Sequence, residues 1–159
     1  MSRAFVKETD GDQALRELPE RPISSQPNFV TSRGMQLIDA QLQRLEQERE
    51  QAKSNDDQDA LARVQRDLRY WQQRKGSAKV VTPEVSPSKV RFGMTVSLRF
   101  EDSDSERAFT LVGEDEAEPQ AGLISWNSPV AQALLGREEG DAMEVQGGRA
   151  EIVRITGGS

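Results

Sequence analysis

Residues 31–75 read TSRGMQLIDAQLQRLEQEREQAKSNDDQDALARVQRDLRYWQQRK, and the pattern in this stretch decides the first half of the fold. Apolar residues recur in it at the three- and four-residue spacing that places them on one narrow face of a helix. They are Met35, Ile38, Leu42, Leu45 and Ala52 before the polar run Lys53-Ser54-Asn55, and Leu61, Val64, Leu68 and Trp71 after it, with Arg49 in the one polar position. The pattern predicts two helices, the first capped by Thr31 and the second ending at Arg74-Lys75 before Gly76.

Each predicted helix has only a narrow apolar face, and its other faces are rich in Gln, Glu and Arg. Two such faces are hidden from water when the helices fold back on each other as an antiparallel coiled coil. We therefore expect residues 29–76 to form a coiled-coil hairpin. At about 20 residues each, its helices would extend roughly 30 Å from whatever anchors them.

After Gly76 the apolar period changes to strict alternation, which is typical of strands with one buried face. Alternation predicts a strand at Met94–Phe100, and shorter signals predict strands at Phe109–Leu111, Leu123–Trp126 and Ile152–Ile155, the last after a turn at Gly147-Gly148. Ser128-Pro129 is a favourable start for a short helix that ends near Leu135. The predicted fold class is therefore α+β, with an N-terminal antiparallel coiled-coil hairpin and a C-terminal, mostly antiparallel sheet with one short helix over residues 77–159.

The first 28 residues have no sustained apolar period and contain Pro19, Pro22 and Pro27. Such a segment does not form a core of its own. We expect residues 1–28 to be a flexible arm that is extended or disordered until it meets a partner.

The composition excludes several classes of function. The chain of 159 residues has no cysteine and no histidine, which excludes disulfides, thiolate chemistry and imidazole catalysis. No apolar run approaches the ~18 residues that span a bilayer, so we expect a cytoplasmic protein. The net charge is -6, and residues 77–159 carry 8 basic and 14 acidic residues. This charge disfavours independent, sequence-specific DNA binding and favours a protein partner.

Several motifs together resemble one protein family. Leu111–Ala117 reads LVGEDEA, Ile124–Pro129 reads ISWNSP and Ala133–Gly136 reads ALLG, with Gly140-Asp141 beyond them. This run resembles the C-terminal domain of the GreA/GreB transcription elongation factors, and Phe92–Val96 (FGMTV) and Thr31–Gly34 (TSRG) fit the same pattern. The resemblance covers most of residues 29–156 and leaves residues 1–27 outside.

The resemblance implies a coiled-coil hairpin followed by an FKBP-like domain. In the family this domain docks on the rim of the secondary channel of bacterial RNA polymerase, and the hairpin enters the channel toward the catalytic magnesium. By motif position it implies partner binding by Asn127, Ser128 and Pro129, which also suit a helix cap and turn. It further implies a monomer with no tightly bound cofactor. An FKBP-like fold does not imply prolyl isomerase activity, which needs an aromatic-lined pocket.

The resemblance also implies a function for the acids in the predicted hairpin turn. Family members that stimulate transcript cleavage carry Asp-x-x-Glu at the tip, and Asp56 and Asp59 have this spacing with Asp for Glu. They would assist catalysis by sharing Mg²⁺ with the polymerase, near the 3′ end of the nascent RNA. The alternative is structural: Asp56 as N-cap and Asp59 at the third helical position would stabilise the helix by about 0.3–1 kcal/mol each.

Two functions follow from the resemblance, and in both the chain is an accessory factor without a complete active site. One is a polymerase-binding elongation factor that promotes transcript cleavage in backtracked complexes. The other is a cleavage-inactive binder, similar to the Rnk branch, that inhibits or competes with Gre factors. Each predicted helix is about one heptad shorter than in typical family members, which withdraws the tip by roughly 10 Å and keeps the second function open.

Charged residues outside these motifs have simpler interpretations. Arg63, Arg66 and Arg69 form a sparse basic stripe that would face RNA or polymerase acids, or pair with Glu and Asp of this chain. The acidic clusters Glu101–Glu106 and Glu114–Glu118 lack the pattern of a calcium-binding loop. We expect both clusters to be solvated loops.

Overall fold

The computed structural model describes residues 18–85 and 87–157. The described residues divide into two compact units: residues 18–27 group with Leu37–Ser77, and Asn28–Gln36 group with residues 78–85 and 87–157. We call them the hairpin unit and the sheet unit. Among the described residues, no helix is long and apolar enough to cross a lipid bilayer.

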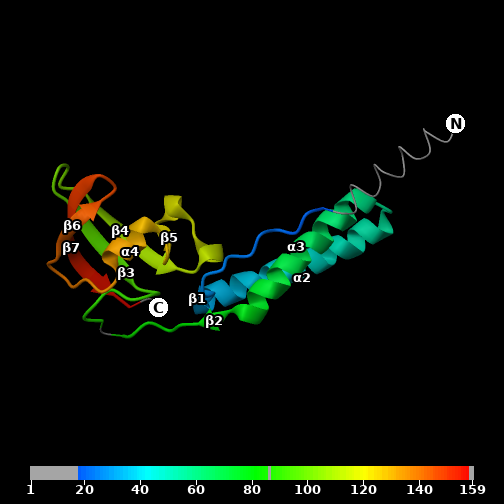
Figure 1. The fold of residues 1–159 in the computed structure, drawn as a ribbon, viewed down its shortest axis with the longest axis horizontal. Coiled ribbons are helices and arrows are strands. Elements are labelled where there is room, and N and C mark those ends of the chain that lie inside the picture. Colours follow the sequence, from blue (N-terminus) through cyan, green and yellow to red (C-terminus); the bar gives the residue numbers. More distant parts are fainter. Residues whose placement is uncertain (1–17, 86, 158–159) are drawn as a thin grey trace. The chain divides into compact units, whose positions relative to one another are not determined.

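Two helices form the hairpin unit. Helices α2 (Ser32–Ser54) and α3 (Gln58–Ser77) run antiparallel and are joined by a turn at residues 55–57 (Figure 1). Their shared core is made by the predicted apolar faces: Leu45 packs with Val64 and Leu68, and Leu42 and Trp71 pack against this cluster. The ion pair between Lys75 Nζ and Asp39 Oδ1, at 2.8 Å, joins the helices again closer to the open end of the hairpin. The predicted hairpin is confirmed.

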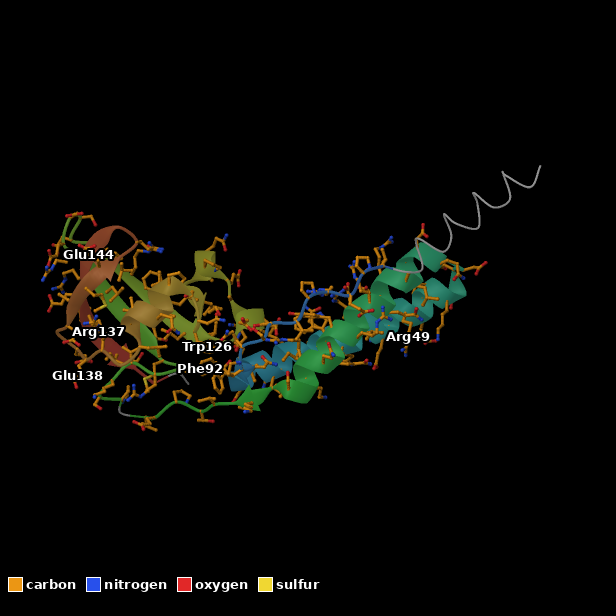
Figure 2. The ribbon with its side chains drawn as sticks, in the orientation of Figure 1. Arg49, Phe92, Trp126, Arg137, Glu138 and Glu144 are labelled. Atoms are coloured by element: carbon orange, nitrogen blue, oxygen red, sulfur yellow. The ribbon has the colours of Figure 1, made fainter. Side chains whose placement is uncertain are left out.

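The hairpin has a charged residue in its apolar face and a longer second helix than the sequence predicted. Arg49, in the polar position of the apolar face, is half-buried, and its Nε lies 3.6 Å from Glu50 Oε1 (Figure 2). Helix α3 ends at Ser77 rather than at Arg74-Lys75, so the predicted end was two residues early. The extension is stabilised by the Ser77 hydroxyl, which donates to the Gln73 carbonyl at 3.1 Å, a group left without a helical partner near the helix end.

The sheet unit contains a five-stranded sheet in the order β5-β4-β3-β7-β6. The strands are β3 (Thr95–Phe100), β4 (Glu106–Val112), β5 (Leu123–Ser125), β6 (Ala142–Val145) and β7 (Gly148–Thr156). All neighbouring pairs are antiparallel except β4 and β5, which are parallel. The predicted α+β class, with an FKBP-like, mostly antiparallel sheet and one short helix, is confirmed.

The core of the sheet unit lies on one face of this sheet. Val96 and Leu98 of β3 are fully buried, as the alternation predicted. Helix α4 (Pro129–Leu134) covers the same core with Ala131 and Leu134, both fully buried. The other buried members of this core are Val90, Met94, Phe109, Leu111, Ile124, Met143, Val145, Ala150, Ile152 and Ile155.

Two very short strands were not predicted. Strand β1 (Phe29–Val30) pairs in parallel with β2 (Lys79–Val80) and brings the residues before α2 beside the residues after α3. The amide of Lys79 donates to the Asn28 carbonyl at 2.8 Å, and that of Val81 donates to the Val30 carbonyl at 2.9 Å. The first turn of α2 therefore belongs to the sheet unit.

The predicted arm is described only from residue 18 onward, and residues 1–17 lie outside the described residues. Residues 18–27 form neither helix nor strand. They group with the hairpin unit, and Arg21 and Glu20 contact α3.

Candidate functional site

The turn of the hairpin fixes the positions of three neighbouring acids. Asp56 has a left-handed backbone with φ of 51°, a conformation that Asp tolerates better than most residues. Asp57 is the N-cap of α3, because its Oδ1 accepts a hydrogen bond from the amide of Ala60 at 3.1 Å. Asp59 is the second residue of α3. All three acids are exposed.

This arrangement corrects the structural interpretation of the tip. We expected Asp56 to cap the helix and Asp59 to be its third residue, but the cap lies one residue later, at Asp57. Since Asp56 lies outside the helix, Asp56 and Asp59 do not share one helical turn as the spacing had indicated. Gln58 Nε2 donates to Asp56 Oδ1 at 3.2 Å. Asp56 therefore does not cap α3, whereas Asp59 still lies in the first turn, where an acid stabilises the helix.

We expect Asp57→Ala to destabilise the hairpin by about 1 kcal/mol, because the amide of Ala60 loses its hydrogen-bond acceptor. Asp57→Asn keeps a side-chain oxygen and should change stability by only a few tenths of a kcal/mol. Thermal unfolding followed by helical circular dichroism compares these variants with Asp56→Asn, which should leave stability unchanged. Equal losses for Asp56→Asn and Asp57→Ala would contradict the assignment of the cap.

The tip acids do not make a metal site by themselves. Within the described ranges, no group of three or more His, Cys, Asp or Glu side chains is placed to hold a metal ion. Mg²⁺ is commonly held in proteins by only one or two carboxylates, with water and substrate oxygens completing its shell. Asp56 and Asp59 supply at most two such carboxylates.

The predicted docking residues follow β5 and run into the start of α4, and two of their side chains are used within the fold. Asn127 Oδ1 accepts from the Ser125 hydroxyl, and Asn127 Nδ2 donates to Glu114 Oε1 at 2.8 Å. Ser128 Oγ accepts from the amide of Ala131 at 3.3 Å and caps α4, as predicted. Pro129, the first residue of α4, is exposed. Of the three residues, Pro129 presents the most accessible surface.

Aromatic packing holds the loop that carries these residues. The ring of Trp126 lies 5.2 Å from that of Phe29 in an edge-to-face arrangement, and Phe29 lies 6.0 Å from Phe92 (Figure 2). Such aromatic pairs stabilise a fold beyond the area they bury. The Trp126 amide also donates to the Val112 carbonyl at 2.9 Å. The position of the docking residues is therefore fixed by both β1 and β4.

Glu116 is a functional position of the fold that sequence reasoning missed. We expected Glu114–Glu118 to be a solvated loop, but Glu116 is only 5% exposed. Its Oε2 accepts from the amides of Thr31 and Gly113, each at 3.0 Å, and its Oε1 accepts from the Thr31 hydroxyl. Thr31 Oγ1 in turn accepts from the amide of Gly34 at 3.0 Å and caps α2, as predicted. One buried carboxylate therefore holds the residue that starts α2.

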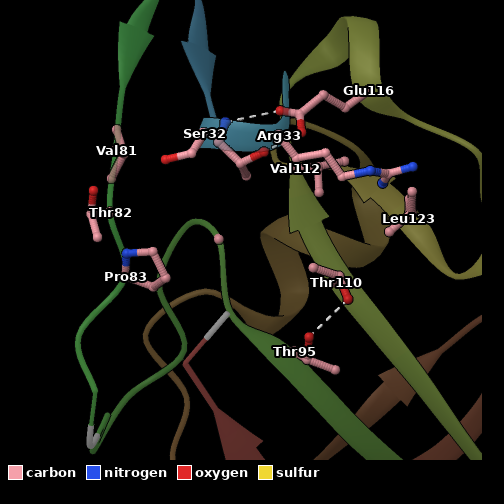
Figure 3. Close-up of a pocket in the computed structure, with 12 residues that line it drawn as sticks. Ser32, Arg33, Val81, Thr82, Pro83, Thr95, Thr110, Val112, Glu116 and Leu123 are labelled. Carbon is pink, nitrogen blue, oxygen red and sulfur yellow. Dashed lines mark hydrogen bonds between the residues drawn. The ribbon is translucent and has the colours of Figure 1, made fainter. Parts of the chain in front are cut away.

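A cavity of about 320 Å³ lies beside this carboxylate in the sheet unit (Figure 3). Thr95 and Thr110 line it, and their hydroxyls are 2.8 Å apart. Its other walls are aliphatic or polar and come from Val81, Pro83, Val112, Leu123 and Arg33 among others. This lining differs from the aromatic pocket that prolyl isomerase activity requires.

Two arginines of the predicted basic stripe on α3, Arg66 and Arg69, are paired with acids. Arg69 Nη2 lies 2.7 Å from Glu20 Oε1, and Arg66 Nη2 lies 3.3 Å from Asp67 Oδ1. The hydrogen bond from Arg69 lowers the pKa of Glu20 below its ordinary value of 4.5. For Arg66 and Arg69, the interpretation as partners of Glu and Asp is therefore confirmed.

Comparisons with known proteins agree with the motifs. Residues 85–156 match the family described as transcription elongation factor, GreA/GreB, C-terminal. The transcription elongation factor GreA of Agrobacterium fabrum is 52% identical over 62 residues, which are 39% of this chain and 39% of that protein. The GreA of Alkalilimnicola ehrlichii is 49% identical over 79 residues, which are 47% of this chain and 50% of that protein.

The match thus spans half or less of the length of these two relatives. Among solved structures, a GreA/GreB factor from Nitrosomonas europaea is 28% identical, with a TM-score of 0.39, over 81% of this chain and 98% of that chain. The motif residues of the segment from β4 to α4 all lie inside the matched range. Residues 85–156 are therefore similar to the C-terminal domain of the GreA/GreB family.

Proposed function

We propose that this chain is a transcription elongation factor that binds bacterial RNA polymerase in the cytoplasm and reaches into its secondary channel. The observation that carries this proposal is the GreA/GreB domain of residues 85–156. The hairpin supports it, because a pair of antiparallel helices precedes this domain and ends in exposed acids. The chain itself acts as an accessory factor, and the polymerase supplies the active site.

The sheet unit supplies the proposed docking surface around Asn127, Ser128 and Pro129. Asn127 and Ser128 set the path of the loop through their hydrogen bonds to Glu114, Ser125 and Ala131. Pro129 lies on the outside of this loop and makes the contact with the channel rim. Because its ring is rigid and its φ is fixed, little conformational entropy is lost when a partner covers it.

The hairpin tip supplies the proposed catalytic assistance. Asp56 and Asp59 present exposed carboxylates, which are hard oxygen ligands suited to Mg²⁺. When shared with the polymerase, such an ion activates water for attack on a phosphodiester. The carboxylates of this chain would hold the ion near the 3′ end of backtracked RNA, and their exposure at the turn leaves them free to do so.

The test is RNA cleavage in arrested elongation complexes. We expect the wild-type protein to stimulate 3′-end cleavage, and Asp56→Asn with Asp59→Asn to reduce cleavage to the level of polymerase alone. Asp57→Asn is the matched control, because it removes a neighbouring tip charge and preserves the cap. Asn also tolerates the left-handed backbone at position 56, so the double variant should fold normally.

Each outcome separates the candidate functions. Unchanged cleavage by the double variant would exclude the role of Asp56 and Asp59 as ligands. Tight binding without cleavage by the wild type would instead identify a Rnk-like, cleavage-inactive binder that competes with Gre factors. Loss of binding in Pro129→Ala, with unfolding unchanged, supports the docking surface. No binding by any variant would overturn the proposed function.

A further inference from the structure

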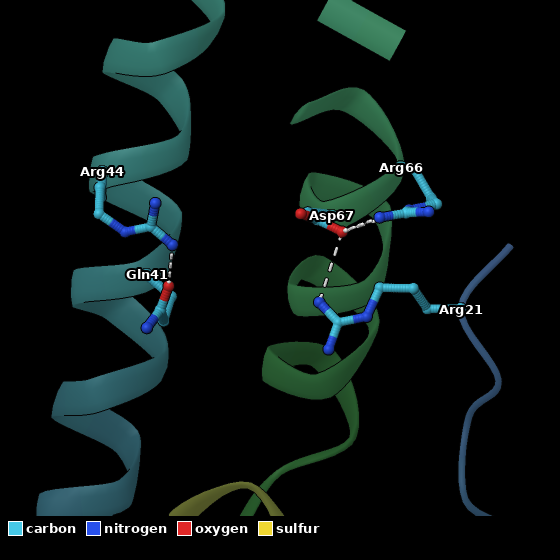
Figure 4. A network of polar contacts seen from close by, with 5 residues as sticks. All are labelled: Arg21, Gln41, Arg44, Arg66 and Asp67. Atoms are coloured by element: carbon cyan, nitrogen blue, oxygen red, sulfur yellow. Dashed lines mark hydrogen bonds and ion pairs between the residues drawn. The ribbon is translucent and has the colours of Figure 1, made fainter. Parts of the chain in front are cut away.

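The described part of the arm is attached to one face of α3, although it lies outside the GreA/GreB domain. Two neighbouring arm residues make the attachment, each with its own partner. Glu20 Oε1 accepts from Arg69 Nε at 2.8 Å. Arg21 Nη1 lies 3.5 Å from Asp67 Oδ1, as Figure 4 shows. Asp67 also accepts from Arg66 Nε at 3.3 Å. Arm and helix are therefore joined by alternating charges.

The side chain of Arg21 also covers an aromatic pair. Its guanidinium lies 3.9 Å from the centre of the Tyr70 ring and 5.9 Å from that of Trp71. The two rings themselves meet edge to face at 5.1 Å. A guanidinium at this distance is attracted by the electrons of the ring face. Arg21 thus occupies a surface on α3 that would otherwise be open to another molecule.

The backbone of the arm is suited to this attachment. Pro19 and Pro22 flank the contact pair, and a residue that precedes proline is restricted to extended conformations. The arm is therefore partly extended before it binds, so that attachment loses less conformational entropy than it would in a flexible chain.

The attachment depends on charge more than on buried apolar surface. An open cavity of about 610 Å³ remains beside the contact, lined by Glu20, Arg21, Ile23, Arg69, Gln72 and Gln73. Ile23, the apolar residue of this set, is 40% exposed. Exposed ion pairs are weak and are screened by salt. Contacts of this kind break and re-form readily, which is the behaviour of a switch rather than of a fixed structural element.

We propose that Glu20 and Arg21 form a reversible latch, which holds the arm across α3 and keeps the face of α3 around Asp67 and Tyr70 closed to RNA polymerase until the latch opens. The part that concerns polymerase rests on the proposed function. A hairpin that enters a channel must present its flanks to the channel walls, and the latched arm covers one flank. A latch that is closed nine times in ten lowers the apparent affinity by about tenfold.

The latch is tested first by NMR, with the chain of residues 1–159 in the absence of polymerase. In the wild type, the Arg21 side-chain protons above the Tyr70 ring should be shifted upfield by the ring current. Glu20→Lys should repel Arg69 and abolish this shift, and Glu20→Lys with Arg69→Glu should restore it by reversing the ion pair. The same Arg21 shift in all three proteins would overturn the latch, because a fixed arm would not respond to these charges.

Acid should open the latch in the same assay. Because the bond from Arg69 lowers the pKa of Glu20, the latch should persist through neutral pH and weaken as the pH falls through that lowered pKa. Arg66 lowers the same pKa further, and Asp67 is the carboxylate that faces Arg21. An Arg21 shift that is constant into strong acid would contradict a latch held by these carboxylates.

Polymerase binding is then compared for the same proteins. We expect Glu20→Lys to bind about tenfold more tightly than wild type and the reversed pair to return to the wild-type affinity. Glu46→Lys is the matched control, because it makes the same charge change at an exposed position of α2. Equal affinity of wild type and Glu20→Lys, or equal gains for Glu20→Lys and Glu46→Lys, would overturn the gating role. Absence of binding by every protein would reject the proposed function and the gating with it, while the NMR comparison decides the latch separately.

Discussion

Replacing Glu116 by alanine should destabilise the sheet unit by about 3–4 kcal/mol, because hydrogen bonds to a buried charged group contribute about 1.5–3 kcal/mol each. The carboxylate accepts from two amides and one hydroxyl, and it is almost entirely buried. After its removal, the amides of Thr31 and Gly113 lose their acceptor in a place that water reaches poorly. Denaturation followed by Trp126 fluorescence in a Trp71→Phe background reports on this unit alone.

Glu116→Gln is the graded control for this result. Its single amide oxygen can still accept from the two backbone amides, but its amino group cannot accept from the Thr31 hydroxyl. We expect a loss of about 1–2 kcal/mol, between wild type and the alanine variant. A loss below about 1 kcal/mol for Glu116→Ala would show that the carboxylate is not needed to hold the start of α2.

Gly34→Ala should be nearly as damaging, although alanine is the better helix former. A Cβ atom at position 34 would lie 2.3 Å from Glu116 Cδ and 2.4 Å from Glu116 Oε2, far inside van der Waals contact. Glu116 would have to leave its hydrogen bonds to make room. We therefore expect a loss of about 2–4 kcal/mol in the same unfolding measurement.

The double variant, Gly34→Ala with Glu116→Ala, tests whether Glu116 alone requires glycine at position 34. Once Glu116 is alanine, the three atoms nearest to a Cβ at position 34 are removed, and Gly34→Ala should then be neutral or stabilising by up to about 1 kcal/mol. The two substitutions would thus be strongly non-additive, as expected for residues in contact. Additive losses would mean that Gly34 is required for a reason other than the nearness of Glu116.

The regular elements of this fold could be predicted because each carries a local signal. The three- and four-residue spacing of Leu42, Leu45, Leu68 and Trp71 predicts the hairpin, and the alternation around Val96 predicts β3. Caps with a hydroxyl side chain, at Thr31 and Ser128, were also found correctly. These signals extend over a few residues, so neighbouring sequence is enough to recognise them.

What could not be predicted depends on contacts between residues far apart in the chain. Strands β1 and β2 have two residues each, too few for any period, and they exist because residues 29–30 meet residues 79–80. The partners Thr31 and Glu116 are 85 residues apart, and an acidic run gives no sign that one of its members is buried. The proposed latch also depends on contacts between distant residues, since nothing in Glu20-Arg21 alone indicates Arg69 and Tyr70 as partners.

The residue that begins α3 could not be predicted for a different reason. Asn55, Asp56 and Asp57 are all good cap residues, so the sequence alone does not decide which one begins α3. In the structure, Asp57 is the N-cap of α3, and Asp56 has a left-handed backbone conformation. A shift of one residue was enough to separate Asp56 and Asp59 from a common helical turn.

Because β1 and the first turn of α2 group with the sheet unit, this unit is discontinuous in the gene. A fragment that begins at residue 78 would lack the acceptors for the amides of Lys79 and Val81, and the threonine that Glu116 binds. A chain in which residues 37–77 are deleted and residue 36 is joined to residue 78 by a short glycine linker would keep these acceptors and Thr31. Evolution can therefore lengthen or shorten the inserted helices while their base stays intact.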